Sequence, residues 1–204
     1  GSRTACRGYD RRMSQTLAGK TIAILATDGV ERVELQGPRD ALRDAGAEIR
    51  LVSLEPGSIK TFDHLDQAGN EQVDETVADA DPAAFDGLLI PGGVANGDLL
   101  RDNEDAVRFV TAFAESKRPI AAICHAPWIL IEAGIVKDRT VTSWPSLRTD
   151  LENAGAEWVD EEVVVDQGLV TSRKPDDIPA FSAKAIEEFA EGAHEDAPKP
   201  DPAD

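Results

Sequence analysis

The 204-residue chain is poor in sulfur: its cysteines are Cys6 and Cys124, and its one methionine is Met13. Residues 1–12 are basic and show no hydrophobic pattern, so we expect them to be a leader left from expression, with the natural start at Met13. Cys124 then stands alone. Because a single cysteine cannot form an internal disulfide, this usage fits a reducing cytoplasm and indicates either a reactive thiol or a small buried side chain.

Other absences exclude whole classes of function. No apolar run approaches the length of a membrane span and no signal-peptide pattern is present, so we expect no membrane association. There is no Cys/His cluster of the metal-binding type, since His64 and His194 are isolated, so no metal site is predicted. No glycine-rich loop opens a helix in a phosphate-binding pattern, so we expect no cofactor. The net charge of −18 repels phosphate backbones and argues against a nucleic-acid partner.

Apolar runs typical of buried strands alternate along the chain with amphipathic segments typical of helices. This alternation predicts an α/β fold, a three-layer sandwich with a mostly parallel sheet and helices on both faces. We expect one domain over residues 13–192 and a disordered, acidic, Pro-rich tail over 193–204, while residues 57–81 are too polar to assign. The expected strands are 20–27, 48–54, 86–90, 120–123, 140–144, 156–159, 163–165 and 169–171, and the expected helices are 31–45, 103–117, 128–133, 146–153 and 177–191.

Cys124 and His125 lie at the joint between the strand at 120–123 and the helix at 128–133. A residue at such a joint is held on a tight turn at the top of the sheet, the geometry of a nucleophile elbow. The free N–H groups and the dipole of the following helix predict a lowered thiol pKa, and therefore a thiolate. The adjacent histidine favours a catalytic cysteine over a merely buried one.

Two further segments reach the same edge of the predicted sheet, where ligands bind in folds of this class. Gly92 and Gly93 follow the third strand. They form either a simple tight turn or, with the N–H of His125, an oxyanion hole based on Gly93. Asp98, which we place in the loop that follows, is either a solvated acid or the group that orients His125 in a Cys-His-Asp relay.

Glu31 and Glu34 lie in the first turn of the helix that follows the first strand, three residues apart and on roughly one face. Acids at this place commonly stabilise a helix start through its dipole. If one of them points at Cys124 instead, it would tune the ionisation and the oxidation of the thiol.

Five segments together carry a specific set of motifs: FDGLLIPGG at 85–93, AICHAP at 122–127, NAGAEW at 153–158, EVVVD at 162–166 and VTSRKPDD at 170–177. On these segments the chain resembles the ThiJ/PfpI superfamily, and within it the PfpI-type intracellular cysteine peptidases and general stress proteins. The resemblance covers roughly residues 20–191. It implies a flavodoxin-like fold of the class I glutamine-amidotransferase type, with the cysteine at the nucleophile elbow.

The resemblance also implies roles for residues around the elbow. It implies a glutamate in contact with the thiol, best matched by Glu31, with Glu34 as the alternative. It implies an acid from a neighbouring subunit beside His125, best matched by Asp98, and hence a homodimer or a higher homo-oligomer. Trp144 falls where such proteins carry an aromatic residue near the site, although a core position fits its pattern equally well.

We therefore expect a cytoplasmic, stress-response cysteine hydrolase that acts on a peptide or on a small carbonyl or acyl substrate. In this hypothesis Cys124 attacks, His125 moves protons, and Gly93 helps to hold the oxyanion. One alternative is a glyoxalase or protein deglycase acting on methylglyoxal adducts, with Glu31 as proton carrier. The other is a redox sensor or chaperone in which Cys124 is oxidised without turnover.

Overall fold

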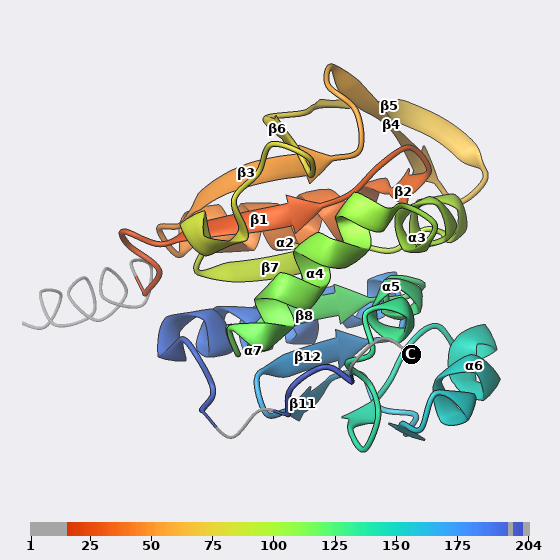
Figure 1. Cartoon of the computed structure of the whole chain (residues 1–204). Helices are drawn as coiled ribbons and strands as arrows, with labels where there is room; N and C mark the ends of the chain where they lie inside the picture. Colours follow the sequence, from red (N-terminus) through yellow and green to blue (C-terminus); the bar gives the residue numbers. More distant parts are fainter. Residues whose placement is uncertain (1–15, 196–197, 202–204) are drawn as a thin grey trace, which may run out of the picture.

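The computed structural model describes residues 16–195 and 198–201, so the predictions for Cys6, Met13 and residues 1–12 lie outside the described residues. A central sheet of seven strands lies between two layers of helices (Figure 1). The strand order is β11-β12-β8-β7-β1-β3-β6, with β11 antiparallel to β12 and the other pairs parallel. The strands are β1 Thr21–Leu25, β3 Glu48–Ser53, β6 Glu75–Thr76, β7 Gly87–Ile90, β8 Ile120–Ile123, β11 Val164–Asp166 and β12 Leu169–Ser172. The predicted α/β fold, with its mostly parallel sheet, is confirmed.

Strand β1 shows why its sequence is apolar without alternation. Ala23 and Leu25 enter the core that helix α4 (Glu104–Glu115) covers. Ile22 and Ile24 enter the core on the other face, which helices α2 (Arg32–Asp44) and α7 (Ile178–Glu191) cover. A strand buried on both faces has no position left for a polar side chain. Figure 1 shows α4 crossing one face of the sheet while α2 and α7 lie behind it. The α-helices are α2 Arg32–Asp44, α3 Val94–Arg101, α4 Glu104–Glu115, α5 Pro127–Glu132, α6 Arg148–Asn153 and α7 Ile178–Glu191.

Helix α3 stands where the sequence predicts a loop, so the prediction for Asp98 is wrong in its local structure. The segment contains Asn96 and Gly97, which both have low helix propensity. Both residues are buried, together with Leu100, and this packing stabilises a helix that propensity alone does not favour.

Two other regions differ from the sequence prediction. The strands expected at 140–144 and 156–159 shorten to β9 Thr140–Val141 and β10 Glu157–Trp158, which pair with each other in a separate two-stranded sheet. The unassigned region forms a hairpin of β4 Ser58–Asp63 and β5 Asp66–Gln72, with β4 beside β2 Val30–Glu31. Strand β5 has few buried side chains, so its sequence carries no hydrophobic alternation to mark it.

The described part of the C-terminal tail lies against the domain. The N–H of His194 donates to the carbonyl of Lys117, and the N–H of Asp201 donates to the carbonyl of Gly134. The carboxylate of Asp201 lies 3.7 Å from Nζ of Lys137. The prediction of disorder for the rest of the tail, residues 196–197 and 202–204, lies outside the described residues.

The sheet register brings three segments of the chain to one edge. Ile24 of β1 lies beside Leu89 of β7, which lies beside Ala121 of β8. Because these strands are parallel, the residues that follow each of them meet beyond their carboxyl ends. Those residues include the start of α2, the Gly92–Gly93 turn and Cys124.

Candidate active site

Cys124 occupies a strained turn between β8 and α5. Its φ is 67°, in the left-handed region that residues other than glycine rarely adopt. Its N–H donates to the carbonyl of Ser172 at 3.0 Å, and its carbonyl accepts the N–H of Trp144 at 2.9 Å. Strain of this kind costs about 1–3 kcal/mol and concentrates at functional sites. The turn has the geometry of a nucleophile elbow, and the side chain is 5% exposed.

Glu34 is the glutamate that meets the thiol. Its side chain is fully buried, its Oε1 accepts the N–H of Gly92 at 3.0 Å, and it lies close enough to Cys124 for each group to shift the pKa of the other. Glu31, the first choice from the sequence, is not at this position. It forms the N-cap of α2, and both of its carboxylate oxygens accept the N–H of His64 at 3.2 Å. The contact expected of Glu31 is therefore made by the alternative, Glu34.

Burial controls the ionisation of both acids at the elbow. Burial, helped by the negative charge of Glu31, raises the pKa of Glu34 from 4.5 to about 8, so its carboxyl is protonated at neutral pH. Burial, followed by the charge of Glu34, raises the pKa of the Cys124 thiol, and the N–H donors of Gly93 and His125 oppose that rise. The predicted lowering of the thiol pKa is therefore wrong. Helix α5 has only six residues, and the loss of water outweighs its dipole.

The imidazole of His125 is placed to act as a base for this thiol. Its Nδ1 lies 3.1 Å from Sγ of Cys124, although neighbours in sequence rarely face each other. Burial lowers the pKa of His125 to about 4, so the ring is neutral at pH 7 and one of its two nitrogens is a hydrogen-bond acceptor. Trp144 stacks on the imidazole at 5.5 Å between ring centroids, and Trp128 approaches it edge-on at 5.2 Å. Trp144 thus lies against the candidate site as well as the core.

Two backbone N–H groups converge on the sulfur, those of Gly93 and His125. Gly93 is the N-cap of α3 with a φ of 95°, and a Cβ there would collide with the carbonyl oxygen of Gly29. Both the conformation and the space therefore require glycine. A pair of N–H donors aimed at one place is the arrangement that an oxyanion hole needs.

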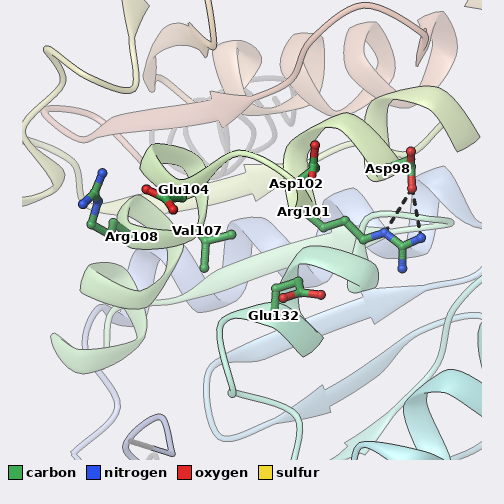
Figure 2. Close-up of a pocket in the computed structure, with 7 residues that line it drawn as sticks. All are labelled: Asp98, Arg101, Asp102, Glu104, Val107, Arg108 and Glu132. Atoms are coloured by element: carbon green, nitrogen blue, oxygen red, sulfur yellow. Dashed lines mark hydrogen bonds and ion pairs between the residues drawn. The ribbon is translucent and has the colours of Figure 1, made fainter. Parts of the chain in front are cut away.

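Asp98 does not meet His125 within this chain. Its carboxylate is 60% exposed and pairs with the guanidinium of Arg101 at 2.9 Å, and that guanidinium lies 4.3 Å from the centroid of the Trp128 ring. The Asp98–Arg101 pair lines a surface hollow, whose volume is about 910 Å³. Figure 2 shows this pair among the lining side chains. The other lining residues are Asp102, Glu104, Val107, Arg108 and Glu132. A Cys-His-Asp relay is not formed by one chain, and a relay across subunits stays a prediction.

Asn96, which the sequence does not single out, ties together the segments around the elbow. It is fully buried, and its Oδ1 accepts the N–H of Thr27 at 2.7 Å. Its Nδ2 donates to the carbonyls of Pro91 at 2.9 Å and Gly92 at 3.1 Å. Because one of these partners lies 69 residues away, no local pattern marks Asn96 as a site residue.

Gly92 is packed too closely for any side chain. A Cβ at this position would lie 2.5 Å from Cβ of Cys124 and 2.5 Å from Oε1 of Glu34. We expect Gly92→Ala to lower the free energy of unfolding by about 3 kcal/mol, because both neighbours are held by buried hydrogen bonds and cannot move aside. The midpoint of urea unfolding measures this loss.

Gly37→Ala is the matched control for that change. Gly37 lies within α2, and a Cβ there would meet only the side chain of Ile178, at 3.0 Å. We expect its effect to stay within about 1 kcal/mol, because the higher helix propensity of alanine offsets a contact with a movable side chain. Equal losses in the two variants would contradict the close packing inferred at Gly92.

The groups that converge on the elbow are a thiol, an imidazole, a carboxyl and two backbone N–H donors. This set suits nucleophilic attack on a carbonyl carbon. Among residues 16–195 and 198–201, no group of three or more His, Cys, Asp or Glu side chains could hold a metal ion. None of the helices in this described part is long and apolar enough to cross a membrane.

Comparison with known proteins gives consistent matches. A model of the DJ-1/PfpI family matches residues 20–188. YraA of Bacillus subtilis (strain 168), named as a proposed cysteine protease, is 41% identical over 167 residues, which cover 82% of this chain and 96% of that protein. General stress protein 18 of the same organism is 43% identical over 169 residues, with 82% and 96% covered. Protein/nucleic acid deglycase 2 of Escherichia coli (strain K12) is 41% identical over 168 residues, with the same coverage.

Solved structures agree with the fold. The crystal structure of Drosophila melanogaster DJ-1beta superposes with a TM-score of 0.76 at 28% identity, covering 84% of this chain and 90% of that one. The match supports the architecture seen in Figure 1, in which a mostly parallel sheet lies between layers of helices.

Proposed function

Because this chain belongs to the DJ-1/PfpI family, we propose that it is a stress-response cysteine hydrolase of the PfpI type, with Cys124 as its nucleophile. The observation that supports this most is the 3.1 Å contact between Sγ of Cys124 and Nδ1 of His125, at a turn with positive φ. A protonated thiol beside a neutral imidazole can form a thiolate at the moment of attack. A serine–histidine pair works in the same way.

In the proposed reaction, Nδ1 of His125 takes the thiol proton as the sulfur of Cys124 bonds to the carbonyl carbon of the substrate. The carbonyl oxygen gains negative charge and accepts the N–H groups of Gly93 and His125. The imidazolium then gives its proton to the leaving amine or alcohol, and a thioester remains. Water hydrolyses the thioester with His125 again acting as base, which restores the thiol.

A glyoxalase or deglycase acting on methylglyoxal adducts is the second candidate, and Glu34 favours it. Such chemistry needs a proton carrier beside the thiol. A carboxyl with a pKa of about 8 both donates and accepts protons near neutral pH. In this proposal Glu34 takes the role that the sequence gives to Glu31. A redox sensor has less support, because both the 5% exposure and the raised pKa of Cys124 slow oxidation.

The name of the Escherichia coli relative includes nucleic acid, which runs against the exclusion drawn from charge. A net charge of −18 disfavours tight binding of a phosphate backbone. It does not bar a modified base that enters a small site as a substrate. In our proposal nucleic acid is therefore no stable partner, while an adduct on an amino group of any carrier is a candidate substrate.

We also propose that the chain acts in the cytoplasm as a homodimer or a higher homo-oligomer, with Asp98 of one copy beside His125 of another. The exposed face of α3 supports this arrangement. It carries Asp98 together with the apolar side chains of Val94 and Leu99, which are 58% and 45% exposed. Apolar side chains grouped beside an active site commonly mark an interface.

The test is a comparison of substrates on the purified full-length protein. Fluorogenic peptides, methylglyoxal and methylglyoxal adducts of an amine are each incubated with the enzyme, and the blank is the same protein alkylated at Cys124. We expect thiol-dependent cleavage of peptides. Thiol-dependent turnover of the adducts alone would replace the hydrolase by the deglycase. No turnover, with stoichiometric oxidation of Cys124 by mild peroxide, would overturn both.

A further inference from the structure

The peptide group between Gly92 and Gly93 has its two ends directed at different partners. Its N–H, on Gly93, points at the sulfur of Cys124. Its carbonyl, on Gly92, accepts the side-chain amide of Asn96 at 3.1 Å and the backbone N–H of Glu31 at 3.2 Å. Because a trans peptide group is planar, its N–H and C=O point in opposite directions, and fixing one end fixes the other.

This peptide group is also one that could easily turn over. A glycine on each side leaves ψ of the first residue and φ of the second almost free of side-chain sterics. If the group rotated by half a turn, its carbonyl oxygen would face the sulfur in place of the N–H. An oxygen there would repel both a thiolate and a developing oxyanion. The observed orientation therefore depends on what holds the Gly92 carbonyl.

We infer that Asn96 is a positioning residue for the reaction: its side-chain amide locks the Gly92–Gly93 peptide with the N–H directed at Cys124. Three hydrogen bonds fix the amide itself, because Oδ1 accepts the Thr27 N–H at 2.7 Å and Nδ2 donates to the carbonyls of Pro91 and Gly92. The fully buried side chain has no water to replace these partners. Thr27 follows β1, so the oxyanion hole is anchored to the centre of the sheet.

This inference rests on the proposed function, since an N–H at the sulfur matters only if Cys124 is the reacting group. Its test uses alkylation of the thiol by iodoacetamide across pH, which requires no turnover of a substrate. The charged or titratable groups that face the sulfur are Glu34 from α2 and the imidazole of His125, and both stay in place in the variants. If the wild-type protein does not cleave peptides, that result counts against the hydrolase, but the alkylation measurement can still be made.

In Asn96→Ala we expect the midpoint of the alkylation profile to rise by about one pH unit and the rate at neutral pH to fall about tenfold, because the thiolate loses a charge-assisted hydrogen bond. Asn96→Leu removes the same donors and keeps more of the side-chain volume. If the alanine variant does not fold, the leucine variant replaces it, and we expect the same shift. Wild-type circular dichroism and a cooperative melt establish that each variant is folded.

Asn103→Ala is the matched control. Asn103 caps α4, where its side chain accepts the N–H of Ala106 at 2.9 Å, so its loss lowers the melting temperature without touching the elbow. The inference is overturned if a folded Asn96 variant keeps the wild-type midpoint, if Asn103→Ala shifts the midpoint equally, or if neither Asn96 variant folds.

Discussion

Cys124→Ser is expected to lower kcat/KM by at least about a thousandfold for whichever substrate the enzyme turns over, a loss of about 4 kcal/mol in transition-state stabilisation. The reason lies in the geometry at the elbow. In the proposed reaction Nδ1 of His125, 3.1 Å from the sulfur, takes the proton of a thiol, whereas a serine hydroxyl is a far weaker acid in the same buried place. The proposed oxyanion donors, the N–H groups of Gly93 and His125, remain, and we expect them to supply only residual catalysis.

Steady-state kinetics on the substrate with the highest wild-type rate measures this loss. Cys6→Ser is the matched control, because it makes the same chemical change at the other cysteine of the chain. We expect it to keep full activity. A Cys124→Ser protein with more than about a tenth of wild-type activity would contradict nucleophilic catalysis by this thiol.

The sequence predicts the fold well because the sheet is buried on both faces. The runs that become β1, β7 and β8 are almost wholly apolar, which is typical of strands buried on both faces. The helices α2, α4 and α7 that cover them each bury an apolar face. The same runs place Gly93 and Cys124 at one edge. What patterning misses is stabilised by distant partners: α3 forms around buried Asn96 and Leu100, although its own residues favour a loop.

The choice between Glu31 and Glu34 illustrates a second limit. Three residues of spacing put both acids near one helix face, but that spacing does not say where the helix begins. The structure begins α2 at Arg32, so Glu31 is a cap outside the helix and Glu34 points inward. The prediction of a lowered thiol pKa fails for a related reason. A helix dipole can be read from sequence, whereas the burial that outweighs it depends on the whole tertiary structure.

Glu34→Gln is expected to remove a pH dependence of several kcal/mol from the stability of the fold. Burial raises the pKa of Glu34 in the folded state to about 8, above its usual 4.5. The folded state therefore holds this proton more tightly than the unfolded state. The stability that protonated Glu34 adds to the folded state is fully present below about pH 4.5, and it is lost as the pH rises through about 8. The shift corresponds to about 5 kcal/mol, which glutamine avoids because it carries no charge.

Urea unfolding of wild type and variant between mildly acidic pH and about pH 9 measures the difference. We expect the two free energies to converge at low pH and the variant to be the more stable above neutral pH. Glu31→Gln is the matched control, since it removes the neighbouring carboxylate and keeps an oxygen for the N–H of His64. Glu31→Gln lowers the pKa of Glu34 only because one nearby charge is lost, so most of the dependence of the unfolding free energy on pH remains. Parallel curves for wild type and Glu34→Gln would contradict a buried, protonated Glu34.

The same substitution separates the two effects of Glu34 on the thiol. The negative charge of Glu34 raises the pKa of Cys124, so we expect Glu34→Gln to move the alkylation midpoint to lower pH. The thiol thus becomes more reactive toward iodoacetamide. If the chain is a glyoxalase or deglycase, turnover falls at the same time, because glutamine cannot carry a proton. A variant that loses turnover and also alkylates more slowly would mean that Glu34 serves the thiolate only as a hydrogen-bond donor. If Glu34→Gln instead shows both faster turnover and faster alkylation, the reaction needs no proton carrier at this position.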